Sequence, residues 1–104
     1  MIEDACHALG AKYKYKNKEY YIGSCKHSDI CVFSFHPIKT ITTGEGGAVV
    51  TNSKDIYEKI KMVRSHGRIS QIDYFNDPKG SQYIELGYNW RMSSLTAALG
   101  ISQL

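Results

Sequence analysis

The lysine at position 39 is the side chain in this sequence best placed to form a covalent bond with a carbonyl compound. Lys39 follows an apolar stretch at residues 29–35 (DICVFSF) and precedes a glycine-rich segment at residues 43–47 (TGEGG). A lysine amine becomes a Schiff-base nucleophile when burial or a nearby positive charge lowers its pKa. The chain has ten lysines, however, and most lysines in proteins are solvated. The local context alone leaves Lys39 open between a catalytic and a solvated role.

Cysteine and histidine side chains raise the question of a metal or thiol site. Cys25, His27 and Cys31 lie close together in the sequence, and Cys6 and His7 are adjacent. The separations do not match a paired Cys-x-x-Cys pattern, so we predict no metal site. Three cysteines make an odd number, which argues against a disulfide framework and favours reduced thiols in a cytoplasmic protein.

A basic, tyrosine-rich stretch at residues 11–22 (AKYKYKNKEYYI) suggests another kind of chemistry. Interleaved lysines and tyrosines can neutralise phosphates and stack on the bases of single-stranded nucleic acid. The same alternation, with Asn17 at a turn, is typical of an exposed hairpin whose lysines discourage edge-to-edge pairing. We prefer the hairpin and expect no nucleic-acid partner. The alternative is a non-catalytic nucleic-acid-binding or interaction module, which salt-dependent binding of an oligonucleotide would support.

Two short apolar stretches supply the strands that would position Lys39. Residues 29–35 and 47–51 (GAVVT) are rich in β-forming residues and read as buried strands. Pro37 favours an extended conformation before it and helps to end the first strand. Two apolar strands need further neighbours to form a stable sheet, so we expect strands that this sequence lacks.

Helical periodicity occurs in two later segments. Residues 53–66 repeat apolar side chains at helical spacing, and Gly67 is suited to end that helix. Residues 92–104 show a second helical pattern that places three apolar side chains on one face: Leu95, Ala98 and Leu99. Residues 68–82, with Asp-Pro and Lys-Gly pairs, are predicted to form a loop.

The bulk composition is that of a soluble globular protein. The chain has 104 residues, a net charge of +3, 42% hydrophobic and 22% charged residues. It has no apolar run long enough to span a membrane, and the small charge does not indicate a polyanionic partner. Because both ends appear cut and the sheet lacks neighbours, we interpret residues 1–104 as a single fragment of a larger domain.

Three motifs resemble one family. Residues 34–47 (SFHPIKTITTGEGG) resemble the cofactor-lysine segment of the DegT/DnrJ family of nucleotide-sugar aminotransferases. Residues 3–10 (EDACHALG) resemble the segment that meets the pyridine nitrogen. Residues 86–92 (LGYNWRM), followed by residues 97–100 (AALG), resemble the segment that crosses the dimer interface. The three occur in family order over nearly the whole chain, and together they are specific.

The resemblance implies a fold and a cofactor. The fold is α/β, as part of the large domain of the aspartate-aminotransferase-like, pyridoxal-phosphate-dependent transferases, a three-layer sandwich with a mixed sheet. Relative to intact members, residues 1–104 are truncated at both ends and lack the first strands and the C-terminal small domain. The cofactor is pyridoxal 5′-phosphate, and Lys39 is the lysine that binds it and then moves a proton.

The resemblance implies cofactor roles for three further residues, and each residue also has a purely structural explanation. Asp4 would hold a proton on the pyridine nitrogen, or it could cap a helix over residues 5–9. His7 would lie near the phenolic oxygen of the ring, or it could pack on a helix face. Ser34 would bind the cofactor phosphate, or it could bond a backbone carbonyl.

The third motif supplies two further candidates. Asn89 would bind the phosphate of the partner subunit's cofactor, or it could be a turn residue. Arg91 would bind a carboxylate or phosphate of the substrate. The glycines after Lys39 are expected to be structural.

The substrate follows from the branch that the motifs resemble most. Residues 35–47 and 65–67 (SHG) are most similar to the enzymes acting on UDP-linked 4-keto-6-deoxy-N-acetylhexosamines on the route to pseudaminic-acid-type sugars. The resemblance implies a nucleotide-linked keto sugar and L-glutamate as substrates, and a homodimer or swapped oligomer. Without its ring-stacking wall, we expect the chain alone to be inactive and to bind the cofactor weakly.

Overall fold

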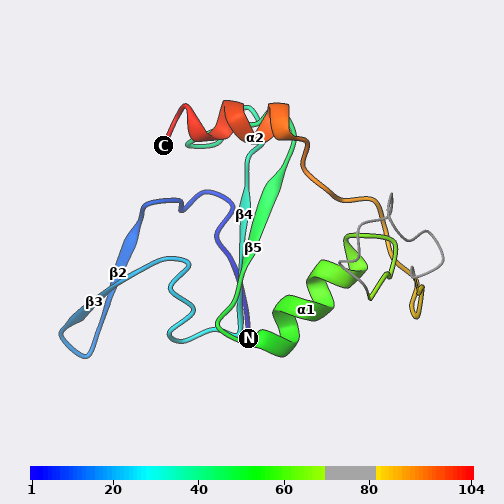
Figure 1. The fold of residues 1–104 in the computed structure, drawn as a ribbon. Coiled ribbons are helices and arrows are strands. Elements are labelled where there is room, and N and C mark those ends of the chain that lie inside the picture. The colour runs from blue at the N-terminus through cyan, green and yellow to red at the C-terminus, as the bar shows by residue number, and fades with distance from the viewer. Residues whose placement is uncertain (70–81) are drawn as a thin grey trace. The chain divides into compact units, whose positions relative to one another are not determined.

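The predicted strand after residue 29 forms the centre of a three-stranded mixed sheet. The computed structural model describes residues 1–69 and 82–104. In it, β4 (Ile30–Ser34) lies beside β5 (Gly47–Val50), as Figure 1 shows, and pairs with it antiparallel. On its other side β4 pairs in parallel with β1 (Ile2–Asp4). Alternate residues of β4 are buried, as expected for a strand whose one face meets the core. The expected α/β class and mixed sheet are confirmed.

The first strand, β1, was not predicted from the sequence. It is only three residues long, and it exists because β4 provides a parallel partner. The Ala5 N–H extends the pairing by donating to the Val32 carbonyl at 2.9 Å. The chain then turns at residues 6–10 and does not form a helix. The alternatives in which Asp4 caps a helix and His7 packs on a helix face are therefore wrong.

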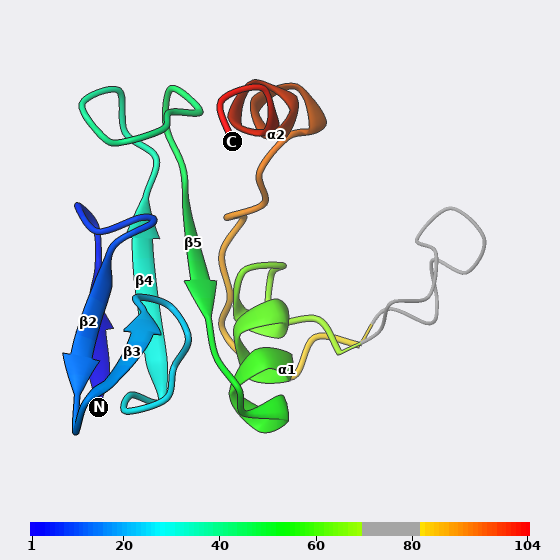
Figure 2. The ribbon, with the colours of Figure 1, turned by 90° about the vertical axis from the view of Figure 1, so that its left-hand side faces the viewer.

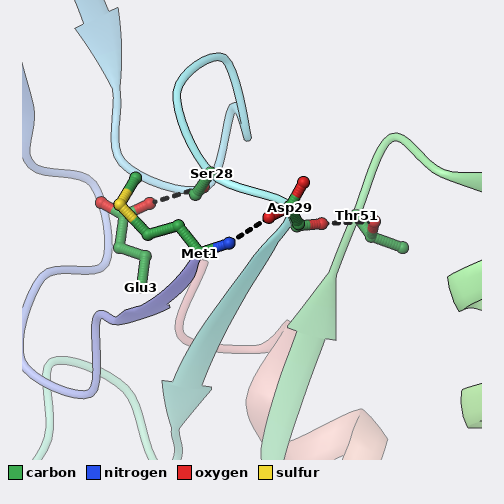
Figure 3. A network of polar contacts seen from close by, with 5 residues as sticks. All are labelled: Met1, Glu3, Ser28, Asp29 and Thr51. Carbon is green, nitrogen blue, oxygen red and sulfur yellow. Dashed lines mark hydrogen bonds and ion pairs between the residues drawn. The ribbon is translucent and has the colours of Figure 1, made fainter.

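A polar network links the start of β1, the residues just before β4 and the residue just after β5 (Figure 3). The Met1 amino group contacts the Asp29 carboxylate. The Ser28 hydroxyl donates to the Glu3 carboxylate at 3.2 Å, and the Thr51 hydroxyl donates to the Asp29 carbonyl at 2.6 Å. The network therefore reaches from β1, past the start of β4, to the residue after β5.

The predicted hairpin is confirmed and forms a separate two-stranded sheet (Figure 2). Strands β2 (Lys12–Tyr15) and β3 (Lys18–Tyr21) pair antiparallel around Lys16 and Asn17, whose φ angles are 48° and 61°. Two consecutive positive φ angles are those of a type I′ turn, which matches the twist of a hairpin. The Lys12 ammonium contacts Glu19 at 2.6 Å and lies over the Tyr21 ring.

A small core lies between the sheet and the turns that follow β1 and β3. Its buried members are Ala5, Cys25, Cys31 and Phe33. Gly23, with φ of 88°, closes against it, because a Cβ there would come within 2.8 Å of the Phe33 ring. All three cysteines are free, and burial raises the pKa of the Cys31 thiol to about 11. Among the described residues, no helix is long and apolar enough to cross a membrane.

The final helix, α2 (Ser94–Ile101), is confirmed within the predicted range. Ser93 caps it, because its hydroxyl accepts from the Thr96 N–H at 3.2 Å. The buried side of the helix is its glycine side. Gly100 is its buried residue, whereas Leu95 and Leu99 are 85% and 48% exposed. The reason is close approach: a Cβ at Gly100 would lie 2.9 Å from the Thr43 methyl group.

Residues 55–91 form a second unit, described here by itself. The predicted helix at residues 53–66 is confirmed as α1 (Lys54–Val63). It ends where His66 and Gly67 adopt φ angles of 65° and 73°, and the Gly67 N–H donates to the Met62 carbonyl at 2.9 Å. Most of the predicted loop at residues 68–82 lies outside the described residues.

Candidate functional site

Lys39 is carried by a loop that closes on itself between β4 and β5. At the neck of the loop, the Phe35 N–H donates to the Gly46 carbonyl at 2.9 Å, and the Thr43 N–H donates to the Phe35 carbonyl at 3.0 Å. Just before the strand resumes, Gly47 lies so near β4 that a Cβ would come 2.6 Å from the Phe33 carbonyl oxygen. These contacts hold the two ends of the loop together. Gly46 and Gly47 take part in them, which agrees with the structural role expected of the glycines.

The closest polar neighbour of Lys39 is His7. The Lys39 Nζ and the His7 Nε2 are 2.6 Å apart, although the residues are 32 positions apart in sequence. Lys39 is half-buried, and His7 lies in the turn after β1. An ammonium group can only donate, so while Lys39 carries its charge the imidazole nitrogen is the acceptor in this contact. The structure therefore brings together two of the predicted cofactor residues.

Asp4 ends β1 and lies near the same two side chains. Its Oδ1 accepts from the Cys6 N–H at 3.1 Å. Hydrogen bonds from the Cys6 thiol and backbone hold the pKa of Asp4 below its usual value, with smaller contributions from Lys39 and His7. The same hydrogen bond raises the pKa of the Cys6 thiol. Asp4 is therefore a carboxylate at neutral pH, the form that can hold a proton on a ring nitrogen.

Ser34 ends β4 at the same edge of the sheet as Asp4. Asp4 is in register with Val32, and parallel neighbours present their carboxyl ends together. The Ser34 hydroxyl oxygen accepts from the His36 N–H at 3.4 Å. Its contact with a cofactor phosphate stays a prediction.

Asn89 and Arg91 lie in the second unit. Asn89 forms an isolated antiparallel bridge with Ser65, and its Oδ1 accepts from the Arg91 Nε at 3.2 Å. The bridge joins the two segments, residues 65–67 and 86–92, on which part of the family resemblance rests. These two candidates therefore contact each other, and their cofactor and substrate roles stay predictions.

Two residues that the sequence reasoning missed support the site. Cys6 lies two residues after Asp4 and lowers the pKa of that carboxyl through its hydrogen bonds. Gln103, two residues after α2, fixes the Lys39 loop: its Oε1 accepts from the Thr42 N–H at 3.0 Å, and its Nε2 donates to the Thr42 carbonyl at 2.7 Å. Nothing in the sequence links positions so far apart.

Comparison with known proteins identifies the family. The sequence matches the DegT/DnrJ/EryC1/StrS aminotransferase family over residues 1–104. This chain belongs to that family. The predicted family is confirmed, and the sheet-edge cluster of Asp4, His7 and Lys39 falls in its first two motifs.

A transaminase is among the most similar relatives. The chain is 50% identical over 104 residues to the UDP-4-amino-4,6-dideoxy-N-acetyl-beta-L-altrosamine transaminase of Campylobacter jejuni, covering 100% of this chain and 25% of that protein. It thus spans about a quarter of the length of the relatives it matches. The predicted branch agrees with the activity that names this relative.

Solved structures share the fold. PseC of Helicobacter pylori, an aminotransferase involved in the biosynthesis of pseudoaminic acid, is 40% identical with a TM-score of 0.75, covering 98% of this chain and 24% of that chain. NtdA of Bacillus subtilis, solved with bound cofactor PMP, is 28% identical with a TM-score of 0.75, covering 98% of this chain and 20% of that one. The fold is therefore that of part of a sugar aminotransferase, and the family and the PMP-bound neighbour imply dependence on pyridoxal phosphate.

Proposed function

We propose that this chain supplies the cofactor-lysine part of a pyridoxal-phosphate-dependent aminotransferase that converts a nucleotide-linked 4-keto sugar to a 4-amino sugar. The observation that carries the proposal is the 2.6 Å contact between the Lys39 Nζ and the His7 Nε2, close to the Asp4 carboxylate. An amine, an imidazole and a carboxylate at one sheet edge, with the Ser34 hydroxyl, form the donor set that pyridoxal phosphate requires.

The cofactor, when bound, supplies an electron sink that stabilises negative charge on a substrate carbon. The residues of this chain would bind and orient it. The Lys39 amine would hold it covalently and would move a proton at the reacting carbon. The Asp4 carboxylate would keep a proton on the ring nitrogen, and the Ser34 hydroxyl would hold the phosphate. His7 would lie between Lys39 and the ring oxygen.

Substrates and assembly belong to the same proposal. The similarity to UDP-sugar transaminases favours a UDP-linked keto sugar, and L-glutamate is the proposed amino donor. Asn89 would reach the cofactor phosphate of a partner subunit, and Arg91 would bind an anionic group of the substrate, which makes a homodimer or a swapped oligomer the working form. Residues 1–104 would be one piece of the cofactor-binding large domain. We expect this chain alone to bind the cofactor weakly and to lack turnover, because it spans about a quarter of the length of its relatives.

The test is an absorption spectrum of the chain with added pyridoxal phosphate, compared with Lys39→Ala and with Lys26→Ala. Lys26 is an exposed lysine of the first unit and serves as the control for non-specific attachment. We expect a visible band of lysine-bound cofactor that Lys39→Ala removes, Lys26→Ala keeps and L-glutamate discharges. Equal bands in both variants would contradict the role of Lys39, and turnover of a keto sugar by the chain alone would contradict its predicted inactivity.

A further inference from the structure

The second unit contains a cleft that the aminotransferase chemistry does not use. The cleft has a volume of about 420 Å³ and is lined mainly by polar and charged side chains of residues 57–69. Three of these side chains are cationic: Lys61, Arg64 and Arg68. Glu58 is the acidic side chain among the lining residues, so the charges of the lining sum to +2 (three positive, one negative).

Local backbone geometry explains why these cations converge. Lys61 lies in the last turn of α1, and Arg64 is the first residue after that helix, where its N–H donates to the Ile60 carbonyl at 2.9 Å. Arg68 comes back to the same side because His66 and Gly67 have positive φ angles of 65° and 73°, and its N–H donates to the Ser65 carbonyl at 3.3 Å. All three line one cleft, and like charges that lie close together repel each other, so an anion between them would be stabilised.

The cations differ in how they are already paired. The Lys61 ammonium is 3.4 Å from the Glu58 carboxylate and 4.9 Å from the centre of the Tyr57 ring, and its side chain is only 23% exposed. Across the part of the chain that the structure describes, neither Arg64 nor Arg68 has an ion-pair partner. Two guanidinium groups with free donors therefore face a cleft that one lysine already makes positive.

We propose that this cleft binds a diphosphate anion, either free or as the diphosphate group of a nucleotide. Guanidinium groups bind phosphate oxygens through paired, charge-assisted hydrogen bonds, and a neighbouring ammonium adds a point charge. The net charge of the lining suits a multiply charged anion better than a single carboxylate. The proposal goes beyond the proposed function and needs neither Lys39 nor the cofactor, so either proposal can fail without the other.

The test is isothermal titration calorimetry of the whole chain at low ionic strength with four probes: pyrophosphate, UDP, uridine and L-glutamate. We expect pyrophosphate and UDP to bind, uridine and L-glutamate not to bind, and added salt to weaken binding. Equal affinities for pyrophosphate and UDP would assign the site to the free anion, and tighter binding of UDP would assign it to a nucleotide. Binding of uridine or L-glutamate as tight as that of pyrophosphate would overturn the proposal.

Charge variants test the residues. Arg64→Gln and Arg68→Gln should each weaken pyrophosphate binding about tenfold or more, as expected for a lost hydrogen bond between charged groups. Glu58→Gln should tighten it, because it removes the opposing charge. Lys54→Gln, which removes a charge from the same helix outside the cleft, should leave affinity unchanged. Unchanged binding in both arginine variants, with circular dichroism showing an intact fold, or an equal loss in Lys54→Gln, would overturn the proposal.

Discussion

The contact between Lys39 and His7 couples two basic side chains that the chain brings together from distant positions. While Lys39 is an ammonium group it can only donate, so His7 orients it through a ring nitrogen that carries no proton. His7 is therefore a positioning residue for Lys39 as well as a predicted neighbour of the ring oxygen.

Replacing His7 should weaken cofactor attachment without unfolding the chain. His7→Ala removes the acceptor, so Lys39 samples more orientations, and we expect apparent affinity for pyridoxal phosphate to fall about tenfold, the value of one hydrogen bond to a charged group. Spectral titration measures it. His7→Gln offers a carbonyl acceptor and should restore most of the affinity. If alanine and glutamine behave alike, the acceptor role is wrong.

The Asp4–Cys6 pair makes a reciprocal prediction about protonation. The hydrogen bond lowers the pKa of Asp4 and raises that of Cys6, so the stabilisation from Asp4 is present above its unfolded pKa and is lost as pH falls below about 3.8. Asp4→Asn should lower the pKa of the thiol and speed its alkylation at pH 8. Cys6→Ala should raise the pKa of Asp4, followed by NMR titration. A Cys6 alkylation rate that does not change in Asp4→Asn would contradict the pairing.

The sequence predicted which residues belong to the candidate site better than it predicted what surrounds each of them. The motifs at residues 3–10 and 34–47 indicated cofactor chemistry and its candidate residues: Asp4, His7, Ser34 and Lys39. Their environments depend on β1, a strand of three residues whose only evidence is the partner β4. Period and propensity cannot detect so short an element, which is why helix-based alternatives for the acid and the histidine were wrong.

At the scale of elements, α2 and the Lys39 loop are joined by one side chain. The amide of Gln103 accepts from the Thr42 N–H and donates to the Thr42 and Leu99 carbonyls at 2.7 and 2.8 Å. Gln103→Ala should expose the Thr42 amide and accelerate its hydrogen exchange, because Gln103 supplies its acceptor. Gln103→Glu keeps an acceptor and should retain more protection. Equal exchange rates in wild type and Gln103→Ala would show that the loop is held by other contacts.

The second unit depends on close approach of two backbone segments. A Cβ at Gly87 would lie 2.0 Å from the Gly67 nitrogen, inside contact distance, so Gly87→Ala should force the segments apart and destabilise the unit by several kcal/mol. The stacked rings of Tyr88 and Trp90, 4.2 Å apart, provide a local signal in near-ultraviolet circular dichroism.

Gly10→Ala is the control for the alanine effect itself. Gly10 has a φ of 80° but open space where a Cβ would be, so its cost is about 1 kcal/mol of backbone strain. A thermal shift no larger in Gly87→Ala than in Gly10→Ala would contradict the proposed packing.

Sequence periodicity predicted most strands and both helices, but it does not determine which side of α2 is buried. The hairpin, β4, β5 and α1 follow from alternation, turn residues and helical spacing. For α2, spacing grouped Leu95, Ala98 and Leu99 correctly, but the loop at Thr43 contacts the glycine side. Which face is buried depends on the shape of a neighbour, and a single segment of sequence does not contain that shape.

At the scale of the whole molecule, apolar surface remains exposed along α2. Leu95 and Ile101 are 85% and 70% exposed, and the helix has no charged residue in its first or last turn. Exposed apolar surface of this kind favours association with another copy of the chain. We therefore expect self-association that rises with protein concentration, measurable by sedimentation velocity.

The double variant Leu95→Gln, Leu99→Gln should shift the chain toward monomer, because it removes the apolar stripe without altering the Gly100 contact with the loop. Ile38→Gln is the matched control: Ile38 is 73% exposed but lies on the Lys39 loop, away from the stripe. If association depends on the helix face, only the double variant sediments as a monomer at concentrations where the parent does not. Equal shifts in both variants would instead show that association depends on exposed apolar residues in general. No shift in either variant would indicate pairing through the backbone at the strand edges, which does not depend on these side chains.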